Sequence, residues 1–149
     1  MDSPSDHFQK PSPVESLINK AIGLLARLGV GPAYMHLLEV RGRRSGKTYT
    51  TPVNLIDLNG RRYLVGARGH TAWSKNAAVA GVVTLRRGFQ SQQYRVVPVS
   101  DELKPEILKA YLDRYRRDVQ RFFAVSAGSP VGAFAAIANM HPVFELRLD

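Results

Sequence analysis

The residues with the clearest capacity for chemistry form one short basic turn, Gly42-Arg43-Arg44-Ser45-Gly46-Lys47-Thr48. Arginine side chains offer paired donors to phosphate oxygens, and glycines allow backbone N–H groups to approach an anion. The turn therefore predicts a binding site for a phosphate-bearing ligand. The alternative interpretation is a basic hairpin tip without a ligand, which is common in proteins with a pI near 10.3.

The turn resembles a nucleotide-binding P-loop only superficially. A P-loop needs a glycine at the position that Arg41 occupies here. Its loop must also open a helix whose N-terminus faces the phosphates. The segment that follows, Tyr49-Thr50-Thr51-Pro52-Val53, is β-branched and contains proline, which is typical of a strand. We therefore do not expect a nucleoside triphosphatase.

Other polar residues give weaker signals. His36, His70 and His141 lack the spacing of metal ligands, so no metal site is expected. His70 is either a proton donor or a solvated loop histidine, and the second interpretation is favoured. The chain has no cysteine, which excludes disulfides and thiolate chemistry.

The acidic residues between Asp101 and Asp118 alternate with lysines and arginines. This pattern favours a salt-bridged solvent face over a pair of catalytic carboxylates. Tyr111 and Tyr115 lie one helical turn apart and either line a substrate pocket or belong to the core, which is the favoured interpretation.

The elements that must position these residues are mostly short strands. Asn59-Gly60 predicts a tight hairpin, and Gly88 a second turn. Asp101 is expected to cap a helix. Together the elements predict a mainly β, α+β antiparallel barrel with peripheral helices. Strands are expected at 37–41, 49–58, 62–66, 82–87, 92–99 and 142–148, and helices at 14–28, 73–80 and 101–123, while 124–140 is ambiguous.

Length and charge bound the remaining possibilities. Residues 1–13 are polar and contain prolines, which predicts a disordered arm. The length of 149 residues predicts a single domain, over 14–149. The net charge of +9 attracts phosphates of some kind without choosing among them. No signal peptide is visible, so a cytoplasmic location is expected. Helix 14–28 leaves peripheral membrane contact open, and the choice between monomer and homodimer is also open.

Three segments together resemble the deazaflavin-dependent nitroreductase family. The first is Gly42-Arg43-Arg44-Ser45-Gly46 with Thr51-Pro52-Val53 after it. The second is Tyr63-Leu64-Val65-Gly66-Ala67-Arg68-Gly69, and the third is Trp73-Ser74-Lys75-Asn76. Each motif is modest alone, but the three occur in the family's order and approximate spacing, and the resemblance runs from about residue 37 to 99.

The resemblance implies a split β-barrel of the flavin-reductase and pyridoxamine-phosphate-oxidase kind. It implies coenzyme F-420, an 8-hydroxy-5-deazaflavin, as cofactor, with a small electron-poor molecule as hydride acceptor. The implied cofactor contacts are Arg43 and Arg44 at the tail phosphate, Ser45 in the same turn, the backbone of Thr51, Pro52 and Val53, the loop Ala67, Arg68 and Gly69, and the pocket-closing Trp73 and Asn76.

Two departures from the family pattern bear on these contacts. Tyr49 stands where family members often carry an arginine, which puts one phosphate contact in doubt. Ala67 stands where some carry a serine that could steady or protonate the substrate. No side chain is required as an acid or base for hydride transfer, because the cofactor carries the chemistry and water can supply the proton.

The expected activity is transfer of a hydride from the reduced cofactor to a quinone, an activated enone or a nitroaromatic. An enzyme of the same barrel that binds flavin mononucleotide (FMN) is the alternative. A nucleic-acid-binding barrel is disfavoured, because strand 49–58 has one tyrosine and no basic residue.

Overall fold

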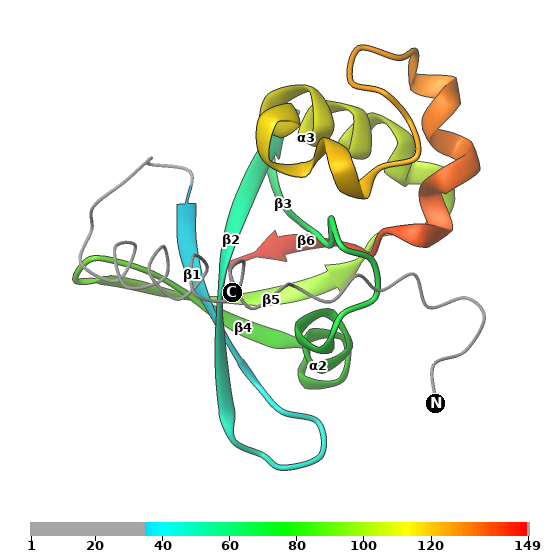
Figure 1. Cartoon of the computed structure of the whole chain (residues 1–149). Helices are drawn as coiled ribbons and strands as arrows, with labels where there is room; N and C mark the ends of the chain where they lie inside the picture. The colour runs from blue at the N-terminus through cyan, green and yellow to red at the C-terminus, as the bar shows by residue number, and fades with distance from the viewer. Residues whose placement is uncertain (1–34, 149) are drawn as a thin grey trace.

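Six antiparallel strands form a closed barrel in the order β1-β2-β3-β6-β5-β4 (Figure 1). The structure is a computed structural model and describes residues 35–148, so the predicted arm 1–13 and helix 14–28 lie outside the described residues. The strands are β1 Met35–Arg41, β2 Thr48–Leu58, β3 Arg61–Val65, β4 Val82–Arg87, β5 Gln90–Pro98 and β6 Val143–Arg147. The predicted split-barrel fold is confirmed, with strand ends shifted by one or two residues.

The hairpins follow from local turn chemistry. Asn59 and Gly60 both have positive φ angles, 54° and 76°, as a two-residue turn between β2 and β3 requires. Gly88 has φ 60° and joins β4 to β5, where Arg87 pairs with Gln90. The second hairpin, which the sequence suggested, is thereby confirmed.

The closure of the barrel depends on contacts between distant segments. β6 lies between β3 and β5, and β1 pairs with β4 through Leu37 to Glu39. These pairings cannot be read from hairpin signals, because no short turn joins the strands concerned.

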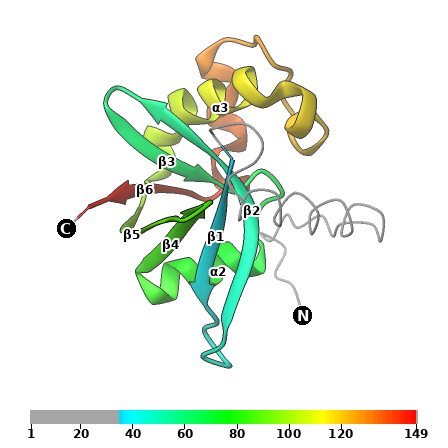
Figure 2. The same cartoon turned by 90° about the vertical axis from the view of Figure 1, so that its left-hand side faces the viewer.

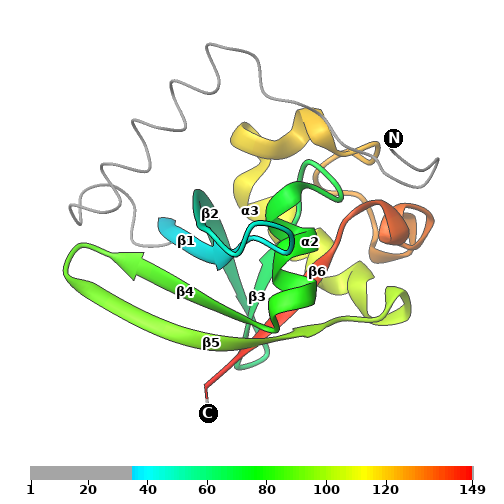
Figure 3. The same ribbon diagram turned by 90° about the horizontal axis from the view of Figure 1, so that it is seen from below.

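The helices lie on opposite sides of the barrel (Figures 1 and 2). α2 (Ala72–Ala80) lies across the middle of the barrel when it is viewed from below (Figure 3). α3 (Lys104–Val119) lies on the other side, together with the 3-10 helix Val131–Met140. No helix within residues 35–148 combines the length and hydropathy that a bilayer crossing requires.

The predicted continuous helix 101–123 is corrected. It consists of a 3-10 turn at Asp101–Leu103, then α3, then a second 3-10 turn at Gln120–Phe122, and Tyr115 interrupts α3 with non-helical angles (φ −109°, ψ 26°). The expected capping role of Asp101 is also wrong. Its carboxylate instead pairs with the Lys104 ammonium, 2.8 Å away, inside the first turn.

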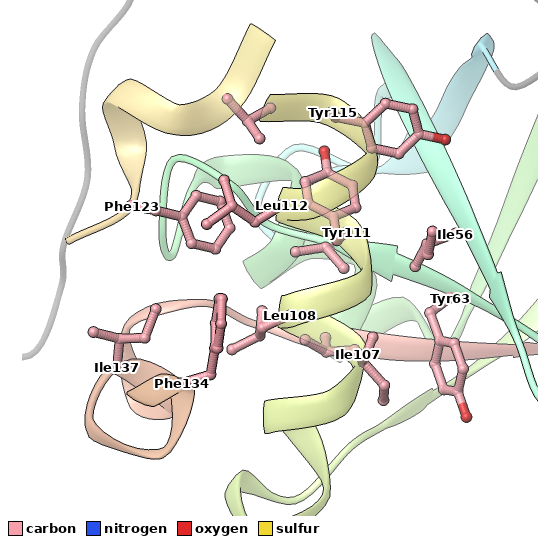
Figure 4. Close-up of a cluster of buried hydrophobic side chains, with 13 residues drawn as sticks. Ile56, Tyr63, Ile107, Leu108, Tyr111, Leu112, Tyr115, Phe123, Phe134 and Ile137 are labelled. Carbon is pink, nitrogen blue, oxygen red and sulfur yellow. The ribbon is translucent and has the colours of Figure 1, made fainter. Parts of the chain in front are cut away.

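Two apolar clusters hold the fold together. One fills the barrel and includes Leu38, Leu64 and Phe144. The other lies between the barrel and the helices on its far side (Figure 4), and its members are Ile56, Tyr63, Val65, Ile107, Leu108, Tyr111, Leu112, Tyr115, Val119, Phe123, Phe134, Ile137 and Val143. Burial of this apolar surface fixes α3 against β2 and β3.

Candidate functional site

A cavity of about 1210 Å³ runs along β2 between α2 and the end of α3. Ligand pockets usually measure roughly 300–1,000 Å³, so this cavity has room for a cofactor together with a second small molecule. Its walls comprise the turn after β1, the β2 residues from Tyr49 to Asn54, the loop after β3, the start of α2, and the segment from Arg117 to Phe122 with Tyr111.

Asn76 of α2 fixes the arginine turn at one end of the cavity. Asn76 is only 5% exposed. Its Oδ1 accepts a hydrogen bond from the backbone amide of Arg43 at 3.0 Å and another from the Arg43 Nη1 at 2.7 Å. The guanidinium is therefore held in place before any ligand enters, which lowers the entropy lost on binding.

Tyr49 shapes the same turn. Its hydroxyl lies 3.1 Å from the Ser45 Oγ, which also accepts from the backbone amide of Lys47 at 3.2 Å. A Cβ at Gly42 would lie 2.5 Å from the Tyr49 ring, so only glycine admits this close packing. Tyr49 is thus a structural component of the turn.

The outer edge of β2 is open toward the cavity. Residues Thr48 to Asn54 pair only with β1, and the pairing of β2 with β3 begins at Leu55. Pro52 is tolerated here because proline, which has no N–H, suits an edge position. The backbone around Thr51 and Val53 consequently borders the cavity, as the sequence resemblance implies.

The loop after β3 lies at the cavity, and close packing restricts which residues it can contain. A Cβ at Gly66 would lie 2.5 Å from the Pro142 ring, and Gly69 adopts φ 92°. Ala67 and Arg68 line the cavity, whereas Gly69 does not. The Arg68 guanidinium lies 4.3 Å from the centre of the Phe122 ring, a distance suited to a cation–π contact.

The helix side of the cavity adds residues that were not predicted as site residues. Arg117, Asp118, Arg121 and Phe122 follow or end α3, and the buried Tyr111 lies beside them. Burial, with Tyr115 and Asp118 nearby, raises the pKa of the Tyr111 hydroxyl, so this group stays protonated. Both tyrosines belong to the core, as the sequence favoured, and Tyr111 lines the cavity as well.

The described side chains that line the cavity carry five guanidinium groups, at Arg43, Arg44, Arg68, Arg117 and Arg121, against one carboxylate, at Asp118. This excess of positive charge favours an anionic ligand and will raise its local concentration. The sequence does show a cluster of basic residues near the end of α3. Their approach to the cavity depends on how α3 packs, which the sequence pattern does not reveal.

Neither His70 nor His141 lines the cavity. The His70 Nε2 lies 2.9 Å from the carbonyl oxygen of Asn139, so the interpretation as a proton donor gains no support. His141 is buried and stacks on Phe123 at 4.2 Å between ring centres. Burial lowers the pKa of His141, and the neutral ring donates from Nδ1 to the Gly66 carbonyl at 3.1 Å.

The structure therefore brings ten of the eleven predicted contact residues to one cavity and leaves out Gly69. Whether these ten touch a cofactor stays a prediction. The acidic residues were expected on a salt-bridged face, and Asp113 fits this expectation with its contact to the Lys109 ammonium at 2.9 Å. Asp118 differs, because it lies at the cavity.

Comparisons with known proteins agree with this geometry. The family model for F420H(2)-dependent quinone reductase matches residues 20–126. No curated protein sequence gives a significant match.

Solved structures support the fold. A structure described as an F420-H2 dependent reductase has 18% identity and a TM-score of 0.52, covering 77% of this chain and 95% of that one. A structure described as a domain-swapped dimer has 18% identity and a TM-score of 0.56, covering 91% and 100%. A candidate pyridoxamine 5′-phosphate oxidase from Listeria innocua has 10% identity and a TM-score of 0.50, covering 89% and 91%.

Proposed function

The chain belongs to the F420H(2)-dependent quinone reductase family, and on that premise we propose that it transfers a hydride from reduced coenzyme F-420 to a quinone, an activated enone or a nitroaromatic. Membership makes the chain an oxidoreductase that uses coenzyme F-420. The identity of the acceptor and the residue roles given below are our proposal.

One observation carries the proposal: a single cavity joins an arginine turn to a wall of uncharged side chains. Arg43 and Arg44 stand on the turn, while Val53, Val65 and Trp73 belong to that wall. A deazaflavin with a phosphodiester tail has two matching parts: its planar ring suits the uncharged wall, and its anionic chain suits the arginine turn. The cavity volume of about 1210 Å³ leaves space for an acceptor beside the ring.

The side chains of the turn would bind the tail. Arg43, held by Asn76, offers a fixed pair of N–H donors, and Arg44 approaches the same anion from the neighbouring position. Ser45 keeps the turn closed through Tyr49. These residues position the ligand and take no part in the transfer of the hydride.

The remaining walls would orient the reacting groups. The open edge of β2 at Thr51, Pro52 and Val53 would lie along the cofactor, and Trp73 and Ala67 would exclude water from its ring. Coenzyme F-420, when bound and reduced, supplies the hydride from its C5 position. The proton that completes the reduction would come from water, so no acid residue is assigned.

The proposal is tested by following oxidation of the reduced coenzyme in the presence of a soluble naphthoquinone, a cyclohexenone or a nitroaromatic. We expect enzyme-dependent turnover with at least one of them. Reduced FMN in place of the coenzyme should give much slower turnover. Tight binding of the coenzyme without turnover of any acceptor would contradict the proposed reaction, and preference for FMN would contradict the assignment of the turn.

A further inference from the structure

Thr71 carries a buried hydroxyl without a partner. The residue precedes α2 and is 8% exposed. Among the described side chains, its Oγ1 is the one buried polar atom that makes no hydrogen bond. A buried polar group left unpaired destabilises a protein, so its retention needs a compensating role.

The local structure does not use this hydroxyl. Threonine before a helix normally accepts a hydrogen bond from an amide in the first turn. Thr71 has extended angles (φ −83°, ψ 173°) and makes no such side-chain bond. Instead the Ser74 Oγ donates to the Thr71 carbonyl at 2.9 Å, and the Lys75 amide donates to the same oxygen at 3.1 Å.

Thr71 is one of the residues that line the cavity. Thr71, Ala72 and Trp73 all line it, and they are the residues at which α2 begins. The first amides of a helix have no acceptor within the helix, and their aligned dipoles favour a negative group at this end. None of the described residues accepts from the amides of Ala72 and Trp73.

We infer that the Thr71 hydroxyl and the first amides of α2 form a binding site for an anionic oxygen of the ligand in this cavity. The hydroxyl donates its proton to that oxygen, and the amides add two further donors. The inference rests on the proposed cofactor cavity and adds a contact at the start of α2 to those of the arginine turn. The oxygen belongs either to the coenzyme tail or to its ring system.

The experiment compares Thr71→Val, which keeps the shape and removes the hydroxyl, with Thr71→Ser, which keeps the hydroxyl. Thr84→Val, on β4 and outside the cavity, is the matched control. Binding of coenzyme F-420 and of the tail-free 8-hydroxy-5-deazaflavin is titrated through the fluorescence of Trp73, which is the chain's single tryptophan and lines the cavity.

We expect Thr71→Val to weaken coenzyme binding by about tenfold, the loss typical of one hydrogen bond to a charged acceptor. Thr71→Ser and Thr84→Val should bind within about twofold of wild type, since each keeps the donor. An equal loss for the tail-free compound places the oxygen on the ring, and a loss confined to the full coenzyme places it on the tail.

The melting temperature without ligand provides a second readout. Because Thr71→Val removes an unpaired polar atom, its melting temperature should equal or exceed that of wild type. A lower melting temperature with unchanged coenzyme affinity would show a purely structural role and overturn the inference. Equal weakening by Thr71→Val and Thr71→Ser would do the same. If wild type bound neither compound, the proposed function would fail as well.

Discussion

The two walls of the cavity are built in different ways. The turn wall is exposed from Arg43 to Tyr49 and is held by polar contacts such as those between Arg43 and Asn76. The α3 wall is supported by apolar side chains that are almost completely shielded from solvent, among them Leu112 and Phe134. On the proposed function, the turn wall would supply the groups that recognise the ligand, and the α3 wall would supply rigidity.

Because of this difference, mutations in the two walls should have different consequences, one for ligand affinity and the other for stability. Substitutions on the turn should change ligand affinity with little effect on folding, because exposed residues contribute little to stability. Substitutions behind α3 should change stability first, because they leave cavities in close-packed surroundings. The predictions below use this contrast, from the largest expected effect to the smallest.

The largest effect is expected at Phe134, which is fully buried behind α3. Phe134→Ala should destabilise the protein by about 3–5 kcal/mol, as expected for removal of a buried aromatic ring. Urea unfolding measures this loss. Val131→Ala is the control on the same 3-10 helix, because Val131 is 42% exposed and should change stability by no more than about 0.5 kcal/mol. Similar losses for both variants would contradict the contrast.

The next effect is expected on the turn. Arg43→Ala and Arg44→Ala should each weaken coenzyme binding about tenfold or more, because a charge-assisted hydrogen bond contributes roughly 1.5–3 kcal/mol. Arginine-to-lysine variants should recover only part of the affinity, since lysine cannot make the paired contact. Isothermal titration measures both. Arg41→Ala, exposed on β1 and outside the cavity, is the control and should bind as wild type does.

Asn76 is buried on α2 and hydrogen-bonds to Arg43 of the turn. Asn76→Ala should weaken coenzyme binding about fivefold, because an unheld Arg43 must be ordered when the ligand binds. In the Arg43→Ala background the same substitution should add almost nothing, so the double-mutant cycle should be non-additive. Independent, additive losses would show that Asn76 acts on the ligand directly. Asn139→Ala, whose position is exposed and outside the cavity, is the matched control.

The smallest effect concerns pH. Burial lowers the pKa of His141 below its ordinary value of 6.5, so the unfolded chain takes up a proton first as the pH falls. The stability that the neutral ring provides is present above pH 6.5 and is lost as the pH falls from there through the folded pKa. His141→Asn should flatten this acid-side loss in urea unfolding at several pH values. An acid-side loss as steep in His141→Asn as in wild type would contradict this assignment.

Local signals in the sequence predicted most of the barrel. Asn59-Gly60 set one hairpin and Gly88 another, and both turns have the positive φ angles that were expected. The position of β6 between β3 and β5 was not predictable, because it depends on pairing between distant segments. The break of α3 at Tyr115 was missed for a similar reason, since that hydroxyl donates to the Leu55 carbonyl of β2.

The candidate site divides along the same line. The site residues of the turn and of the strand after it were predicted because they are close in sequence and because arginine and glycine residues there indicate phosphate binding. Arg117, Arg121 and Phe122 were missed because only the packing of α3 brings them to the cavity. Gly69 was included for its place in a motif; it adopts φ 92° and does not line the cavity.

The most direct test of the account is a comparison of two ligands on one variant. Wild type and Arg43→Ala/Arg44→Ala are titrated with coenzyme F-420 and with the tail-free 8-hydroxy-5-deazaflavin. If the turn binds the tail phosphate, the double variant should lose at least about tenfold in affinity for the full coenzyme and almost nothing for the tail-free compound. Unchanged affinity for the coenzyme, or an equal loss for both ligands, would contradict the claim that this turn binds the tail.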